Sequence, residues 1–189
     1  MYKQQISSVL SLDVKTKRQF RGVYAMDRLP CNRRPGLYVI NMDNHNEPGS
    51  HWVAVYVGSG DSIAAVAYHG AYRATRNAMA DTMVGNTIVG NAMVGNATVG
   101  NGCHVEYFDS YGRAPSDPRL LHFLGSKYRY NSIVLQRPLS SSCGYYCLYF
   151  LLQRARGVSA NEIVYTLSRT DSDFVVKHYV LTRYKYVFS

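Results

Sequence analysis

One stretch of the chain decides the fold class: CGYYCLYFLLQ, residues 143–153. It has the length of a helix and is apolar on every side, which is typical of a helix buried at the centre of a domain. Serines precede it at 140–142 and Gly157 follows it, and these residue types cap and end helices. We therefore expect a central buried helix that begins at Cys143.

The composition fits one globular domain. The chain has 189 residues, of which 47% are hydrophobic and 17% charged, with 15 glycines and 6 prolines. These values exclude disordered, collagen-like and disulfide-scaffold proteins. Its apolar runs are far shorter than the roughly 18 residues of a membrane span, and no charged-then-apolar leader opens it. The cysteines, four in all, are too few for a disulfide framework. We expect an unprocessed protein, without a membrane segment, in a reducing compartment.

The net charge of +9 comes from 21 Lys and Arg against 12 Asp and Glu. The excess lies before residue 35 and after residue 104, whereas residues 59–104 are neutral. Most of the cations are arginines, which suit forked contacts with phosphate. This charge favours contact with a polyanion such as DNA, and a solvated basic surface without a partner is the alternative.

Strand-like and helical runs follow one another along the chain. Runs of β-branched and aromatic residues are bounded by turn-forming residues and lie at 36–41, 51–57, 105–109 and 132–136. Helical runs lie at 118–124, 159–168 and 171–179. Ser159 and Glu162 have the spacing of a capping box. Sequential strands with helices gathered at the two ends predict an α+β fold.

A short repeat interrupts this pattern. Four copies of xxVGN run from Thr82 to Asn101. A period of five residues fits neither a strand nor a helix, and the Gly-Asn pair in each copy favours turns. We expect residues 61–101 to be an inserted low-complexity arm within a single domain that spans residues 1–189.

Polar residues stand at the ends of these elements: His51 at the start of a strand, Asp109 and Gln136 at the ends of two others, and Cys143 at the mouth of the buried helix. A helix N-terminus favours the thiolate form of a cysteine. An imidazole within reach would take its proton and return it to a leaving group. A carboxylate on the other ring nitrogen would hold the imidazole in line. The Cys143 N–H and the Gln136 amide would then hold an oxyanion.

The order and context of these residues resemble the adenovirus protease (adenain) family, including relatives encoded by Polinton/Maverick elements and adintoviruses. The matching strings are His51-Trp52, YFDSYG at 107–112, Gln136 and CGYYC at 143–147. SUMO-specific proteases are more distantly similar and share the His-Trp, Asp, Gln and Cys-Gly order. The resemblance spans residues 20–180 without the arm.

This resemblance implies a papain-like cysteine protease fold of the adenain/SUMO-protease type, with a central mixed sheet, a buried helix that carries the nucleophile, and flanking helices. It implies that Cys143 is the nucleophile, His51 the general base, Asp109 the orienter and Gln136 an oxyanion-hole donor. It also implies a preference for small residues, often glycine, before the cut. We expect a monomeric viral or transposon-encoded protease that matures virion precursor proteins in the virion and host nucleus, with no cofactor required for the chemistry.

The chain departs from the family in two ways. His51 and Asp109 are 58 positions apart, and removal of residues 61–101 restores the shorter spacing of the family. The adenoviral enzyme is stimulated by DNA and by a basic peptide that forms a disulfide with a cysteine between the acid and the nucleophile. Because no cysteine lies between Asp109 and Cys143, we expect no covalent peptide activator, whereas stimulation by DNA stays an expectation.

Other residues compete for the same roles. His45 is the rival base, but it lies in a polar turn, where histidines are usually exposed. Glu106 and Asp117 are rival acids. Cys147, one turn further along the buried helix, is expected to be a packing residue.

Other functions compete as well. Cys103 and His104 beside the two helix cysteines lack the paired spacing of a zinc site, so we expect no metal. An isopeptidase that removes ubiquitin-like modifiers is the alternative enzyme. A basic DNA-binding virion protein without catalytic activity is the alternative of another class.

Overall fold

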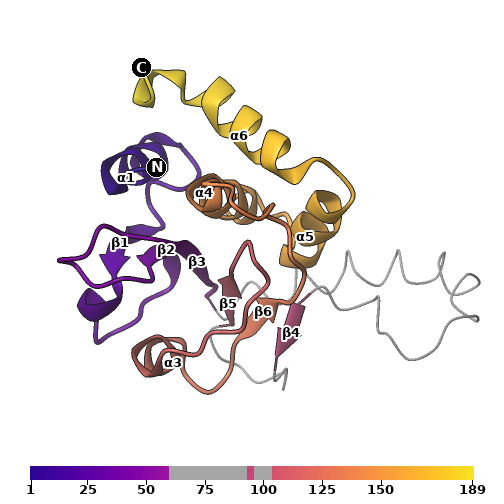
Figure 1. Cartoon of the computed structure of the whole chain (residues 1–189). Coiled ribbons are helices and arrows are strands. Elements are labelled where there is room, and N and C mark those ends of the chain that lie inside the picture. The colour runs from indigo at the N-terminus through magenta and orange to yellow at the C-terminus, as the bar shows by residue number, and fades with distance from the viewer. Residues whose placement is uncertain (60–92, 96–103) are drawn as a thin grey trace, which may run out of the picture.

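The structure is a computed structural model that describes residues 1–59, 93–95 and 104–189, with the backbone alone for 93–95. At its centre lies a six-stranded sheet with the order β1-β2-β3-β5-β6-β4 (Figure 1). The strands are β1 (Phe20–Ala25), β2 (Gly36–Asn41), β3 (Trp52–Val57), β4 (Met93–Gly95), β5 (Val105–Phe108) and β6 (Arg129–Asn131). The β1–β2 and β5–β6 pairs are parallel and the other pairs are antiparallel, so the sheet is mixed, as expected.

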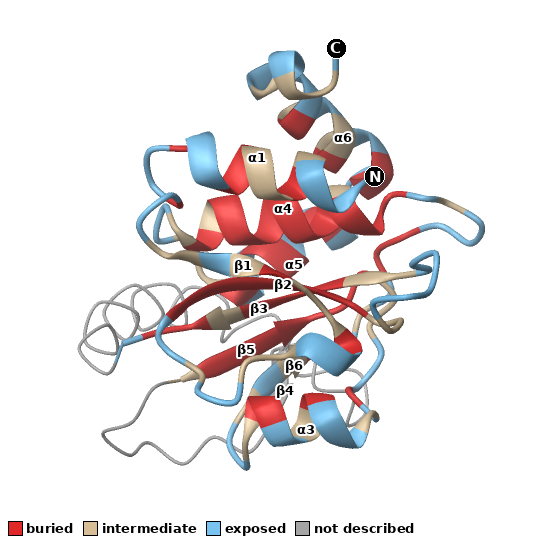
Figure 2. Ribbon diagram, turned by 90° about the vertical axis from the view of Figure 1, so that its left-hand side faces the viewer, coloured by how far each residue is buried: buried red, intermediate tan, exposed pale blue. Residues whose placement is uncertain are grey.

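Helices cover both faces of the sheet within the described ranges. They are α1 (Lys3–Leu12), α3 (Pro118–Leu124), α4 (Cys143–Arg154), α5 (Ala160–Ser168) and α6 (Ser172–Arg183). One face carries α1, α4, α5 and α6, and the other carries α3 (Figure 2). The predicted α+β class is therefore confirmed. None of these helices combines the length and the apolarity that crossing a bilayer requires.

The predicted central helix is α4. Ten of its twelve residues are buried, and it lies directly on β3. The ring of Phe150 stacks on Phe108 of β5 with centroids 4.5 Å apart. Burial of each large apolar side chain in such a core stabilises the fold by about 1.5–3 kcal/mol. The helix that begins with Cys143 is thus fixed along its whole length.

The alternation of side chains along β2 separates the two cores. Leu37 and Val39 are fully buried on the face that α4 covers. Tyr38 and Ile40 point to the other face, where they pack with residues of α3. Both faces of this strand are apolar because helices cover both sides of the sheet.

Several predicted elements are confirmed and one is misplaced. The strands at 36–41, 51–57 and 105–109 and the helices at 118–124 and 159–168 are present, and the helix expected at 171–179 extends to Arg183. The strand expected at 132–136 is wrong, because β6 ends at Asn131. The N–H groups of Leu135 and Gln136 bond instead to the carbonyl of Ser110 at the end of β5. α1 and β1 were not predicted from the sequence.

The inserted segment joins β3 to β5, which are antiparallel neighbours. Residues 93–95, within the third repeat, form β4 and pair with β6 at the edge of the sheet. A short strand is thus present there, although the five-residue period of the repeat fits neither a strand nor a helix. The rest of the arm lies outside the described residues.

A buried ion pair ties α4 to β5. Arg154 Nε donates to Glu106 Oε2 at 2.6 Å and Nη2 donates to Oε1 at 3.1 Å. The guanidinium also lies 4.3 Å from the centroid of the Tyr56 ring on β3. Burial raises the pKa of Glu106, but the hydrogen bond from His104 and the charge of Arg154 outweigh it and lower the pKa overall. The carboxylate is therefore ionised, and the Arg154 guanidinium balances its charge.

We expect Glu106→Gln to destabilise the protein by about 3–5 kcal/mol, because it leaves the buried Arg154 charge without its partner. Urea denaturation of both proteins measures the difference. Arg119→Ala is the control: it removes an exposed ion pair with Asp117, and a loss below about 1 kcal/mol is expected. Equal losses in the two variants would contradict a structural role for the buried pair.

Candidate active site

Cys143 is the first residue of α4 and is 8% exposed. The N–H groups in the first turn of a helix have no partner within the helix. The prediction that the preceding serines cap this turn is wrong, because the N-cap residue Ser142 makes no side-chain capping bond. Its hydroxyl pairs instead with that of Ser140 at 2.6 Å. The first turn of α4 is therefore not capped by the Ser142 hydroxyl.

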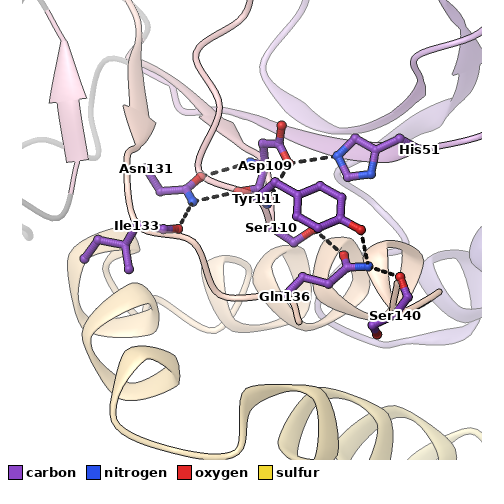
Figure 3. Close-up of polar contacts among 8 residues, drawn as sticks. All are labelled: His51, Asp109, Ser110, Tyr111, Asn131, Ile133, Gln136 and Ser140. Atoms are coloured by element: carbon purple, nitrogen blue, oxygen red, sulfur yellow. Dashed lines mark hydrogen bonds and ion pairs between the residues drawn. The ribbon is translucent and has the colours of Figure 1, made fainter. Parts of the chain in front are cut away.

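His51 and Asp109 lie side by side because of the strand register. In the antiparallel β3–β5 pair, Ala54 is opposite Phe108, so the start of β3 and the end of β5 lie at the same end of the sheet. His51 Nε2 lies 2.8 Å from Asp109 Oδ1 (Figure 3). The other ring nitrogen is left for the thiol of Cys143, which interacts with the His51 ring. The structure thus brings the predicted base, orienter and nucleophile together.

Asp109 is 3% exposed and is held from several sides. Its Oδ1 also accepts a hydrogen bond from the backbone N–H of Tyr111 at 2.8 Å. The side chain of Asn131 bonds both to the Asp109 N–H, at 2.9 Å, and to its carbonyl, at 2.7 Å. Asn131 was not identified from the sequence, because no local pattern shows that the last residue of β6 contacts the residue after β5. It fixes the backbone from which the carboxylate projects.

The electrostatics of the site favour an imidazolium–thiolate pair. Burial lowers the pKa of His51, but the hydrogen bonds with Asp109 and Cys143 outweigh it and raise the pKa to about 9. Burial raises the pKa of Cys143, but the His51 ring and the backbone N–H groups of Trp52 and Gly144 outweigh it, so the pKa falls below its ordinary value. The two shifts stabilise charges of opposite sign next to each other, and they belong to the pair as a unit.

Gln136 lies beneath this group and is 2% exposed. Its Oε1 accepts a hydrogen bond from Ser110 Oγ at 2.7 Å. Its Nε2 donates to the Tyr111 hydroxyl at 3.1 Å and to the carbonyl of Ser140 (Figure 3). The residue is therefore near the site, as predicted, but both of its amide hydrogens are engaged within the protein.

The loop before α4 is anchored by Asp173 of α6, which is 7% exposed. One carboxylate oxygen accepts from the Ser140 hydroxyl at 2.9 Å and the other from the Arg137 N–H at 3.2 Å. Between these two contacts, Leu139 has a φ of 64°, which is unusual for a residue with a side chain. Asp173 was missed in the sequence because this contact joins segments far apart in the chain.

Gly144 follows Cys143 in the first turn of α4 and has no side chain to fill the space beside the helix. In the structure the side chain of Met1 fills that space, with Sδ 2.9 Å from the position that a Cβ on Gly144 would take. Glycine at this position lets Met1 pack against the first turn of α4.

The rival residues have structural roles elsewhere. His45 is half exposed and pairs with Asp27 at 2.5 Å. Glu106 belongs to the buried ion pair, and Asp117 caps α3 by accepting from the Arg119 N–H. Cys147 is buried in the core, and burial raises its pKa. Among the described residues, no group of His, Cys, Asp and Glu has the arrangement of a metal site.

The comparisons with known proteins do not identify a relative: no protein-family model matches the chain, and no curated protein matches it. Function must therefore be inferred from the site. An activated thiol, an imidazole and a buried carboxylate in this order can attack a carbonyl carbon and pass a proton to the leaving group.

We expect alkylation of Cys143 by iodoacetamide to persist to lower pH than alkylation of an ordinary thiol, because the lowered pKa of Cys143 keeps the reactive thiolate populated there. In His51→Ala the loss of the imidazolium raises the Cys143 pKa, so the rate profile moves to higher pH by about 1–3 pH units. Mass spectrometry of the labelled peptides measures the rates. The exposed Cys31 is the internal reference, and an unchanged Cys143 profile in the variant would contradict the pairing.

Proposed function

We propose that the chain is a cysteine endopeptidase that cleaves virion precursor proteins during maturation. The observation that carries the proposal is the His51 ring, held by a buried carboxylate on one nitrogen and paired on its other side with a thiol at a helix N-terminus. The resemblance to the adenain family supplies the substrate class: precursor proteins with small residues, often glycine, before the cut. The fold proposed with it is the papain-like fold of that family.

The geometry supports a thioester mechanism. The Cys143 thiolate attacks the carbonyl carbon of the scissile bond, and the electron pair of the C=O π bond moves to the oxygen, which becomes an oxyanion. The backbone N–H of Cys143 is directed to the same end of α4 and stabilises this oxyanion, a contribution of about 3 kcal/mol for a typical donor. The carbonyl then re-forms as the C–N bond breaks, and the His51 imidazolium gives its proton to the leaving amine. Water, deprotonated by the neutral His51, attacks the thioester, the C–S bond breaks, and the acid product leaves the thiolate–imidazolium pair restored.

Asp109 orients this reaction without taking part in the bond changes. Its carboxylate accepts from His51 Nε2, which keeps the other ring nitrogen toward Cys143. Because the carboxylate also accepts from the Tyr111 N–H, it cannot rotate away from the ring at low cost.

Maturation in the virion and host nucleus, and stimulation by DNA, belong to the same proposal. The net charge of +9 supports contact with DNA, and the excess lies outside the neutral residues 59–104. No cofactor takes part in the proposed chemistry, and a monomer suffices because the triad residues all come from one chain.

We expect Cys143→Ala to lower peptide cleavage by about 10⁴-fold or more, since the nucleophile is removed. A library of peptides that varies the residues before the cut measures the rate and the specificity. Cys147→Ala is the matched control on the same helix, and its activity should be retained. Cleavage that is equal in the Cys143→Ala variant and the unmodified protein would refute the proposal. Faster cleavage of a Gly-Gly-tailed modifier than of precursor peptides would favour the isopeptidase instead.

We expect binding to a short DNA duplex to fall about tenfold or more between about 50 and 200 mM salt, because lysines and arginines that neutralise phosphates release counterions. Fluorescence anisotropy of a labelled duplex measures the affinity. A response that is flat in salt would contradict phosphate contact. DNA binding by a chain that cleaves no peptide would support the non-catalytic alternative.

A further inference from the structure

The Gln136 amide has no hydrogen left for a substrate. A primary amide carries two N–H donors. One is donated to the Tyr111 hydroxyl at 3.1 Å and the other to the Ser140 carbonyl. Because the Ser140 carbonyl can only accept, it fixes which end of the amide carries the N–H groups, and Oε1 at the other end accepts from Ser110 Oγ. Substrate contact with Gln136 would therefore require two internal hydrogen bonds of a buried side chain to be given up.

The Tyr111 hydroxyl, in contrast, has its own hydrogen to give. A phenol has one donor hydrogen and two acceptor lone pairs, and the bond from Gln136 uses a lone pair. Within the described part of the chain, the Tyr111 hydroxyl donates to no acceptor. Accepting a hydrogen bond polarises the O–H group and strengthens it as a donor. Gln136 thus prepares Tyr111 to donate.

Tyr111 also lies directly beside His51 and Asp109. Its ring centroid is 5.1 Å from that of His51, with the planes tilted by 34°. Its backbone N–H bonds to Asp109, so the residue is fixed to the triad itself. Unlike Gln136, it is only partly buried, and it lies between the imidazole and the amide (Figure 3).

From this geometry we infer that the Tyr111 hydroxyl is the side-chain donor to the carbonyl oxygen of the substrate, and that Gln136 is a positioning residue that acts through it. The inference rests on the proposed peptidase function. As the Cys143 thiolate attacks, the oxygen that gains charge accepts from the Tyr111 O–H and from the Cys143 N–H. The hydroxyl keeps its hydrogen throughout, so the proton balance of the His51 cycle is unchanged.

Tyr111→Phe tests this assignment, because it keeps the ring beside His51 and removes the donor. We expect kcat to fall by about 10²-fold with little change in KM, as for the loss of one oxyanion donor. Affinity for a peptide aldehyde, whose thiol adduct carries the tetrahedral oxygen, should fall in parallel. The rate and pH profile of Cys143 alkylation should stay unchanged, which shows that the triad is folded and intact.

Two further variants separate the roles. Tyr184→Phe is the matched control, because it removes a tyrosine hydroxyl that bonds to Asp13 instead, and kcat should be retained. Gln136→Ala should lower kcat, and the double variant with Tyr111→Phe should be no slower than Tyr111→Phe alone, since both changes act on one donor.

A kcat within twofold of the unmodified protein in Tyr111→Phe, with a large loss in Gln136→Ala, would overturn the assignment and identify Gln136 as the direct donor. That outcome leaves the peptidase function standing. Turnover that does not depend on Cys143 would instead refute the peptidase function, and the role of Tyr111 with it.

Discussion

α4 is apolar around nearly its whole circumference, and this property requires it to be covered by the sheet on one side and by α1, α5 and α6 on the others. Water can reach it only near its ends. The N-terminal end of α4, where N–H groups without a partner in the helix favour negative charge, lies at the end of the sheet where β3 starts and β5 ends. The same burial that stabilises the fold therefore places a thiol, an imidazole and a carboxylate at one point. Displacement of α4 would remove the core and the candidate site together.

The three residues after β5 connect the parts of this site. Asp109 holds the imidazole through its side chain, and Ser110 receives the backbone of the Gln136 segment while its hydroxyl fixes the amide. Tyr111 returns to the carboxylate through its N–H. Consecutive residues of one turn thus position the imidazole and the groups proposed to hold the oxyanion. In the proposed reaction, a distortion of this turn would affect both proton transfer and carbonyl polarisation.

The sequence alone predicts the parts of this arrangement that depend on local pattern, such as the all-round apolar helix and the polar residues at the ends of strands. It fails where partners are distant in the chain. Ser142 looks like a helix cap, but its hydroxyl is drawn into a network with Ser140 and Asp173 of α6. The strand expected at 132–136 gave way because backbone bonds to Ser110 are available there. The spacing of Ile6, Val9 and Leu10 in α1 was visible but was not recognised.

The connection between β3 and β5 is closed at its base by the bond from the Gly58 N–H to the His104 carbonyl, at 2.9 Å, next to the ion pair of Glu106 and Arg154. A loop whose ends are already fixed changes length at small entropic cost, about 0.6 kcal/mol for each doubling. Short repeats of this kind can be gained or lost in whole units by replication errors in the coding sequence. The base of the arm is therefore a position where evolution can vary the length of the chain while the geometry of the candidate site remains constant.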